Sequence, residues 1–138
     1  MKRIVVGVDG SEGSKRAVQW AAEEARLRDA TLELVYVYDP PYVPNMIVGV
    51  NIEGLRYAAV EEAEGVLAEA AGEVSDVRVE TVALSDTSPA NALLAQSKGA
   101  EMLVVSARGI GAFQRLLLGS VSTHLANHAD VPLAIIRD

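Results

Sequence analysis

The chain has 138 residues, half of them hydrophobic, with a formal net charge of −7 and no cysteine. Its length and apolar content indicate a single globular domain with a sizeable core, and the lack of cysteine excludes disulfides, thiol catalysis and cysteine–zinc sites. The acidic balance argues against nucleic acid as the main partner, because phosphate backbones require a basic surface.

The chain opens with a β-branched run at residues 4–8, which predicts a buried strand. This run is too short and too β-branched for the apolar region of a signal peptide. No apolar run in the chain is long enough to span a bilayer. We therefore expect a cytoplasmic protein whose first element is a strand.

A turn follows the first strand, and Asp9, Ser11 and Ser14 could each cap the helix after it. Small apolar side chains on one face predict that helix over residues 14–28. A second strand is expected at residues 31–37. After it, prolines break regular structure within a long loop at 39–52, and long loops in compact domains are often functional.

The second half of the chain repeats the alternation of helix and strand. Apolar period predicts a helix over residues 53–74, and alternation predicts a strand over 77–84. Pro89 suits the first turn of a third helix, which we expect to end near residues 98–99. The remaining expected elements are a strand at 102–105, a helix at Ser120–His128 and a strand at Leu133–Ile136.

Strands that alternate with helices predict an α/β fold, a Rossmann-like open sheet of five parallel strands with helices on both faces. We expect the strand order 3-2-1-4-5. In such sheets, ligands bind beyond the carboxyl ends of the strands, where the strand order reverses. The first strand ends at Gly7, Asp9 and Gly10, and Gly109 and Gly111 follow the fourth. If these strands are neighbours, both turns line one crevice.

Asp9 has two readings in that crevice. Near phosphates its carboxylate is useful with a metal ion, and a magnesium ion held partly by phosphate would fit. Its other reading is the N-cap of the first helix, and the two roles can coexist.

The common nucleotide motifs are absent. No G-x-x-x-x-G-K-[ST] occurs, and Gln114 stands where G-x-G-x-x-G requires its third glycine. Instead, Gly119 and Ser120 open the last predicted helix, and free N–H groups at a helix start attract anions. Glycine lets the backbone approach a ligand closely, and the hydroxyl groups of Ser120 and Ser122 are additional donors.

These features together resemble the universal stress protein family, in its small single-domain form, over the whole chain. The resemblance rests on the opening Ile-Val-Val-Gly-Val-Asp-Gly-Ser at residues 4–11, the proline-bearing loop after the second strand, and the closing run at 131–136. Nucleotide-binding members carry G-x2-G-x9-G-[ST]. Gly109, the spacer at 110–118, and Gly119 with Ser120 match it, whereas Ser106 replaces the first glycine.

The resemblance implies binding of ATP with magnesium. Val8, Asp9 and Val37 would border the adenosine, with Val37 beside the adenine. Val105 and Ser106 would line the ribose. The residues that would approach the phosphates are Arg108, Gly109, Gly119, Ser120, Val121 and Ser122. An arginine is a sensible phosphate partner, and the alternative for Arg108 is a solvated loop charge.

Ser106 leaves two functions open. The first is an ATP-binding regulatory protein with at most slow hydrolysis, because Asp9 is the only nearby carboxylate that could serve as a base. The second is a nucleotide-free interaction protein whose site has degenerated at Ser106. A flavin-binding or adenylating enzyme is the weakest reading. The resemblance also implies a homodimer that pairs Leu133–Ile136 with its copy, and an edge strand invites such pairing.

Three further features of the sequence have more than one interpretation. His124 and His128 share a helix face at a spacing that suits zinc, but no third ligand is evident, so we expect them to pack behind the helix. Phe113 and the leucines at 116–118 either pack beneath their loop or present a partner surface. Trp20 is expected to pack at a helix–sheet edge.

Overall fold

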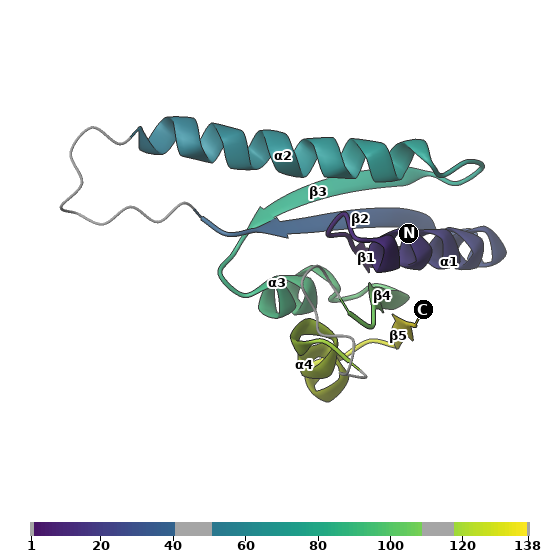
Figure 1. Cartoon of the computed structure of the whole chain (residues 1–138). Coiled ribbons are helices and arrows are strands. Elements are labelled where there is room, and N and C mark those ends of the chain that lie inside the picture. Colours follow the sequence, from purple (N-terminus) through teal and green to yellow (C-terminus); the bar gives the residue numbers. More distant parts are fainter. Residues whose placement is uncertain (1, 41–50, 109–117, 138) are drawn as a thin grey trace.

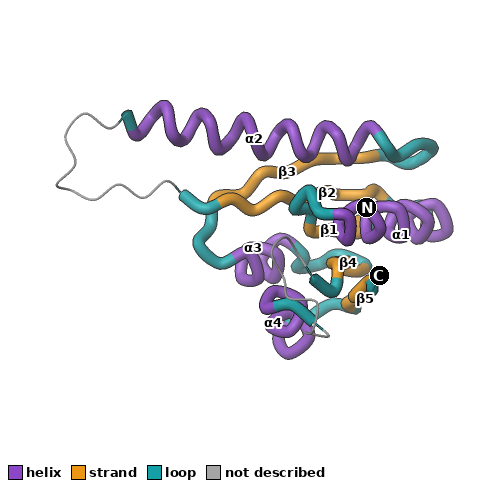
Figure 2. The backbone as a smooth tube through the Cα atoms, in the orientation of Figure 1, coloured by secondary structure: helices purple, strands orange, loops and turns teal. Residues whose placement is uncertain are grey.

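The computed structural model describes residues 2–40, 51–108 and 118–137 (Figure 1). Within these ranges strands and helices alternate along the chain, as predicted (Figure 2). In chain order they are β1 (Arg3–Gly7), α1 (Glu12–Arg28), β2 (Thr31–Tyr38), α2 (Ile52–Gly72), β3 (Val79–Ser85), α3 (Pro89–Gln96), β4 (Met102–Ser106), α4 (Ser120–His128) and β5 (Leu133–Ile136).

The five strands form one parallel sheet in the order β3-β2-β1-β4-β5, which confirms the predicted order. Helices α1 and α2 cover one face of the sheet, and α3 and α4 cover the other (Figure 1). The fold is therefore the predicted Rossmann-like α/β arrangement with helices on both faces.

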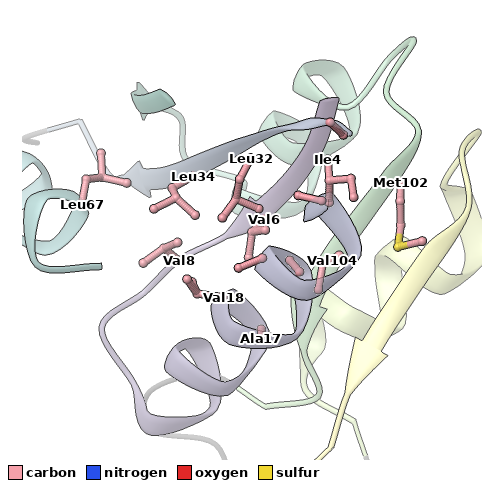
Figure 3. Packing of buried hydrophobic residues seen from close by; sticks show 14 residues of the cluster. Ile4, Val6, Val8, Ala17, Val18, Leu32, Leu34, Leu67, Met102 and Val104 are labelled. Carbon is pink, nitrogen blue, oxygen red and sulfur yellow. The ribbon is translucent and has the colours of Figure 1, made fainter. Parts of the chain in front are cut away.

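Side chains of successive strand residues enter the two cores alternately. Ile4 and Val6 of β1, and Val8 just after it, pack in one cluster with Ala17 and Val18 of α1 (Figure 3). Val5, between them, belongs to the core under α3 and α4. Because both faces of β1 are covered, its near-continuous apolar sequence is what a central parallel strand requires.

The start of α1 settles which of the three possible caps is used. Ser11 is the N-cap, and its hydroxyl oxygen accepts a hydrogen bond from the amide of Ser14 at 3.1 Å. Asp9 is therefore not the N-cap, which corrects one reading of that residue. It lies two residues earlier, where its carboxylate accepts from both the amide and the hydroxyl of Ser11.

Several other element boundaries differ from the prediction by one or two residues. β3 begins at Val79 rather than at residue 77, after Asp76 adopts a left-handed conformation with φ 63°. α3 ends at Gln96 and is capped by Ser97, while Gly99 turns the chain with φ 79° toward β4. The bounds of α4 and β5 match the prediction at both ends.

Two features of the helices concern an exposed side chain and their length and apolar character. Trp20 is 37% exposed, and its expected packing at a helix–sheet edge stays a prediction. None of the helices in the described ranges is long and apolar enough to cross a membrane. The central part of the predicted 39–52 loop lies outside the described residues.

Candidate functional site

The carboxyl ends of β1 and β4 lie side by side, as the sequence predicted. Val5 pairs with Leu103 and Val6 with Val104 in the parallel ladder. From β1 the chain continues to β2 on one side, whereas β4 lies on the other, so the strand order reverses between β1 and β4. This reversal is the position where open parallel sheets bind ligands.

The turn from β1 to α1 is held by a short chain of hydrogen bonds that starts at Asp9. Oδ1 of Asp9 accepts from the amide of Ser11 at 2.9 Å and from its hydroxyl at 2.6 Å. The amide of Asp9 donates to the hydroxyl oxygen of Ser14 at 3.1 Å, and Ser14 is fully buried. One carboxylate oxygen of Asp9 is thus committed to the turn, which fixes the side chain just beyond the carboxyl end of β1.

The end of β4 is tied to the start of α4 through one carbonyl group. The carbonyl oxygen of Ala107 accepts from the amide of Gly119 at 2.6 Å and from the hydroxyl of Ser122 at 2.8 Å. The amide of Ala107 donates to the carbonyl of Ile136 at the end of β5. These bonds bring together two segments of the predicted phosphate motif that are more than ten residues apart in sequence.

The first turn of α4 begins with backbone amides that have no acceptor among the described residues. Gly119 is the N-cap in extended conformation, and it supplies no side-chain cap. In the described part of the chain, no acceptor takes the amides of Ser120, Val121 or Ser122. Because such amides carry the positive end of the helix dipole, this turn is suited to an anion.

The two serines of this turn have different surroundings. Ser120 is exposed, so its hydroxyl can reach a ligand. Ser122 is only 2% exposed, and its hydroxyl donates into the protein, to Ala107 and at 3.1 Å to Gly119. A hydroxyl has a single hydrogen, and these two carbonyl groups already use it. The side chain of Ser122 therefore supports the turn, and only its amide could donate to a ligand.

Ser106, the residue in place of the motif's first glycine, folds its side chain back onto the backbone. Its hydroxyl donates to the carbonyl oxygen of Arg108 at 3.0 Å. Arg108 itself is half-buried. Gly109, predicted at the phosphates, lies outside the described residues, as do Phe113 and the leucines at 116 and 117.

The predicted valines divide between the two faces of the sheet. Val37, Val105 and Val121 all belong to the core on the side of α3 and α4. Val8 packs on the opposite side, with α1 and α2, and its amide donates to the carbonyl of Val35. The structure therefore places three of the four valines on the face of the sheet that α3 and α4 cover, and Val8 on the opposite face.

Sequence reasoning missed Tyr36, which lies near the carboxyl end of β2. Burial raises the pKa of its phenol, and the negative charges of Glu62 and Asp9 raise it further. The phenol thus stays neutral in a place where two carboxylates are close. The available signal was position alone, since the last residues of a parallel strand face the ligand edge.

A small cavity lies between α1 and α2, beside the β1–α1 turn. Its volume is about 150 Å³, and its walls include Val8, Gly10, Lys15, Val66 and Glu69. Among the residues that the structure describes, no group of three or more histidine, aspartate or glutamate side chains could hold a metal ion.

Residues 1–137 match the profile of the universal stress protein family. A universal stress protein of Mycolicibacterium smegmatis is 40% identical over 97% of this chain and 47% of its own length. One from Thermus aquaticus is 35% identical over 99% of this chain and 98% of its own. The chain thus spans about half the length of the first relative and nearly all of the second.

A solved universal stress protein in complex with cAMP is also similar. It is 27% identical, with a TM-score of 0.68, over 99% of this chain and 96% of that one. The family profile covers nearly the whole chain, and the fold and strand order agree with it. The chain belongs to the universal stress protein family.

Proposed function

We propose that this protein binds an adenine nucleotide, ATP with Mg²⁺, at the carboxyl ends of β1 and β4, and that it acts as a cytoplasmic stress-response regulator. The observation that carries the proposal is the first turn of α4, whose amides at Ser120, Val121 and Ser122 have no acceptor in the described part of the chain. The similar solved structure that contains cAMP supports a nucleotide as the ligand.

The phosphates would lie against the start of α4. The amides of Ser120 and Val121 and the exposed hydroxyl of Ser120 would donate to phosphate oxygens. Gly119 would allow the close approach, and Arg108 and Gly109 would contact the phosphates from the β4 side. Ser122 would hold the turn in place through Ala107 and contribute its amide.

The adenosine would lie across the ends of β1, β2 and β4. Val37 and Val105, on the wall shared with α3 and α4, would flank the adenine and the ribose. Ser106 would face the ribose with its backbone, since its hydroxyl is directed to Arg108. Val8 would contribute its carbonyl, because its side chain and amide are already engaged in the fold.

Magnesium would be held chiefly by phosphate oxygens and water. Oδ1 of Asp9 already accepts two hydrogen bonds from Ser11, so Oδ2 is the atom that we assign to the cation or to its water. One carboxylate oxygen with phosphate and water ligands is a common set for Mg²⁺. Any hydrolysis would be slow, because Asp9 is fixed by the turn and phosphoryl transfer needs a positioned water.

The assembly that we propose is a homodimer formed by β5. This strand lies at the edge of the sheet and pairs with β4, and its four residues are all partly exposed. An uncovered apolar edge strand is a ready template for a strand from a second copy.

The decisive experiment is made on protein purified without added nucleotide. Heat denaturation would release any bound nucleotide for ion-exchange chromatography, and an empty sample would be titrated with Mg-ATP by calorimetry. Near-stoichiometric adenine nucleotide, or binding in the micromolar range, is expected. An empty protein that gives no heat with Mg-ATP would contradict the proposal and favour a nucleotide-free interaction protein.

Ser120→Asp sharpens this test because it should preserve the stability of the helix while it weakens the binding of the ligand. A carboxylate in the first turn stabilises a helix by about 0.3–1 kcal/mol but repels phosphate. The variant should melt no lower than the wild type and yet lose Mg-ATP binding. Ser120→Asn, of similar size and neutral, should retain most of the affinity. Equal binding by both variants would place the phosphates away from α4.

A further inference from the structure

The sequence predicts that both histidines of α4 pack behind the helix, but the structure does not bury them there. Their rings form a near-parallel stack with centroids 4.3 Å apart and planes inclined by 19°. His128 is exposed and His124 is half-buried, so solvent reaches the pair. On α4, His124 lies about one turn and His128 about two turns beyond the amides of Ser120 and Val121.

A hydrogen bond determines which nitrogen of His128 carries the proton. Its Nδ1 lies 2.9 Å from the carbonyl oxygen of His124. A carbonyl can only accept, so Nδ1 must be the donor. The neutral ring then carries a lone pair on Nε2. Donation from one ring nitrogen to a backbone carbonyl is the contact that usually orients a metal-binding histidine.

We propose that His124 and His128 form a two-histidine site for a divalent transition metal ion, with Cu²⁺ preferred over Ni²⁺ and Zn²⁺. Positions four apart in a helix are neighbours on its surface, and the stack shows that these two rings do meet. Small rotations of the rings would direct both Nε2 atoms to one ion at about 2.0–2.1 Å. The preference for Cu²⁺ follows the general affinity order of nitrogen sites.

The surroundings fit an open, exchangeable site. α4 carries no lysine, arginine, aspartate or glutamate, so no cationic side chain of the helix opposes the ion. The described residues include no group of three potential ligands, so water would complete the coordination. Mg²⁺ should not bind here, because it prefers oxygen ligands. This site is therefore separate from the magnesium that we propose beside Asp9.

The test is a calorimetric titration of the full, chelator-treated protein with Ni²⁺ and with Cu²⁺ in excess Mg²⁺. One equivalent of each ion should bind, Cu²⁺ more tightly. His124→Gln and His128→Gln should each weaken binding by about tenfold or more. Asn127→Gln, which changes the same helix and keeps both rings, should bind like the wild type.

Nitrogen NMR of the histidine rings gives a second readout that does not depend on the stability of the variants. His128 should show a proton on Nδ1, and Zn²⁺ should shift the Nε2 signals of both rings. The proposal is overturned if no ion binds in excess Mg²⁺, if both glutamine variants bind undiminished, or if the Nε2 signals do not respond to Zn²⁺. If one variant fails to fold, the other and the NMR titration decide the matter.

Discussion

Gly13, in the first turn of α1, lies directly against Ser106 at the end of β4. A Cβ atom at position 13 would stand 3.2 Å from the Cβ of Ser106 and 3.2 Å from the carbonyl oxygen of Arg108. Both distances are tighter than ordinary van der Waals contact. The side chain that replaces the motif's first glycine therefore occupies space that a glycine on α1 leaves free.

Gly13 and Ser106 should consequently be energetically coupled. Gly13→Ala gains about 1 kcal/mol of helix propensity but must push residue 106 or the carbonyl of Arg108 aside. In a Ser106→Gly background one of these contacts disappears, so alanine should be better tolerated at position 13. Urea unfolding of the four proteins should give a coupling energy of about 1 kcal/mol.

A matched control lies in the middle of α2. Gly65 is also helical, but an added Cβ there would meet no atom within 4 Å. Gly65→Ala should therefore stabilise the protein by about 1 kcal/mol in either background. Additive effects of the Gly13 and Ser106 substitutions, within about 0.5 kcal/mol, would show that the two residues do not share space.

Substitutions of Ser122 and Ser120 should distinguish a residue that stabilises the site from a residue that contacts the ligand. Ser122→Ala removes a buried hydrogen bond to Ala107 and should cost about 1 kcal/mol of stability, with weaker Mg-ATP binding as the turn loosens. Ser120→Ala, at an exposed position, should change stability by less than about 0.5 kcal/mol and affect only binding. Chemical unfolding and calorimetry on the same preparations check both. An unchanged midpoint for Ser122→Ala would contradict the assigned support role.

Some of this site could be predicted from sequence, and some could not. The bounds of α4 and β5 followed from strong local signals, a Gly-Ser pair before one and a proline before the other. The choice of Ser11 over Asp9 as the cap could not be predicted, because both residues suit the role and the hydrogen bonds of the folded turn decide.

The inward direction of the Ser122 side chain could not be predicted from the sequence either. Its partner, Ala107, is fifteen residues away and reaches it only because β4 and α4 meet in the fold. The contact of Gly13 with Ser106 joins residues even farther apart in sequence. Local pattern thus predicted the elements and the edge of the sheet where the site lies, while the division of labour among its residues depends on tertiary contacts.

The ion pair between Arg3 and Glu33 should matter for folding and not for the site. Glu33 is 6% exposed and accepts from Arg3 at 3.3 Å and from Gln96 at 2.7 Å, toward the amino ends of the strands. Glu33→Ala removes a buried carboxylate that accepts from two side chains and should cost about 2 kcal/mol, because Arg3 still donates to the carbonyls of Gln96 and Lys98. Mg-ATP affinity at the opposite edge should not change in the folded variant.

An exposed ion pair provides the comparison. Glu23 pairs with Arg26 at 2.9 Å, but its side chain is 70% exposed. Glu23→Ala should cost less than about 1 kcal/mol, because solvent screens such pairs. Denaturant midpoints decide between these expectations, and equal losses for Glu23→Ala and Glu33→Ala would mean that the buried network adds nothing.

Tyr36 should make the protein sensitive to alkaline pH. Burial first, and then the charges of Glu62 and Asp9, raise the pKa of its phenol above the ordinary value of 10.0. The folded state therefore holds the proton more tightly than the unfolded chain. This contribution is fully present below about pH 10 and is lost as the pH rises through the raised, folded pKa.

Denaturant midpoints measured from about pH 8 to pH 11 should fall at the alkaline end in the wild type, and less steeply in Tyr36→Phe. Tyr57→Phe is the control, because Tyr57 is 72% exposed and its removal should leave the wild-type slope. Identical slopes for Tyr36→Phe and the wild type would mean that another group causes the alkaline loss.

The proposed dimer should depend on the outer edge of β5. The amide of Leu103 donates to the carbonyl of Pro132, and that of Ala107 donates to Ile136, so the even-numbered residues of the strand face β4. The backbone groups of Leu133 and Ile135 therefore face the open edge, since successive residues alternate. A charge on this edge should prevent pairing with a second copy, as lysine does on natural edge strands.

Ile135→Lys should accordingly convert a dimeric mass to a monomeric one in light scattering at micromolar concentration. Ile135→Val keeps the apolar edge and is the control for lost packing, because Ile135 also contacts the core beneath α3 and α4. A thermal melt of each variant would show that it is folded. A wild type that is already monomeric, or an Ile135→Lys variant that remains dimeric while folded, would remove β5 from the interface.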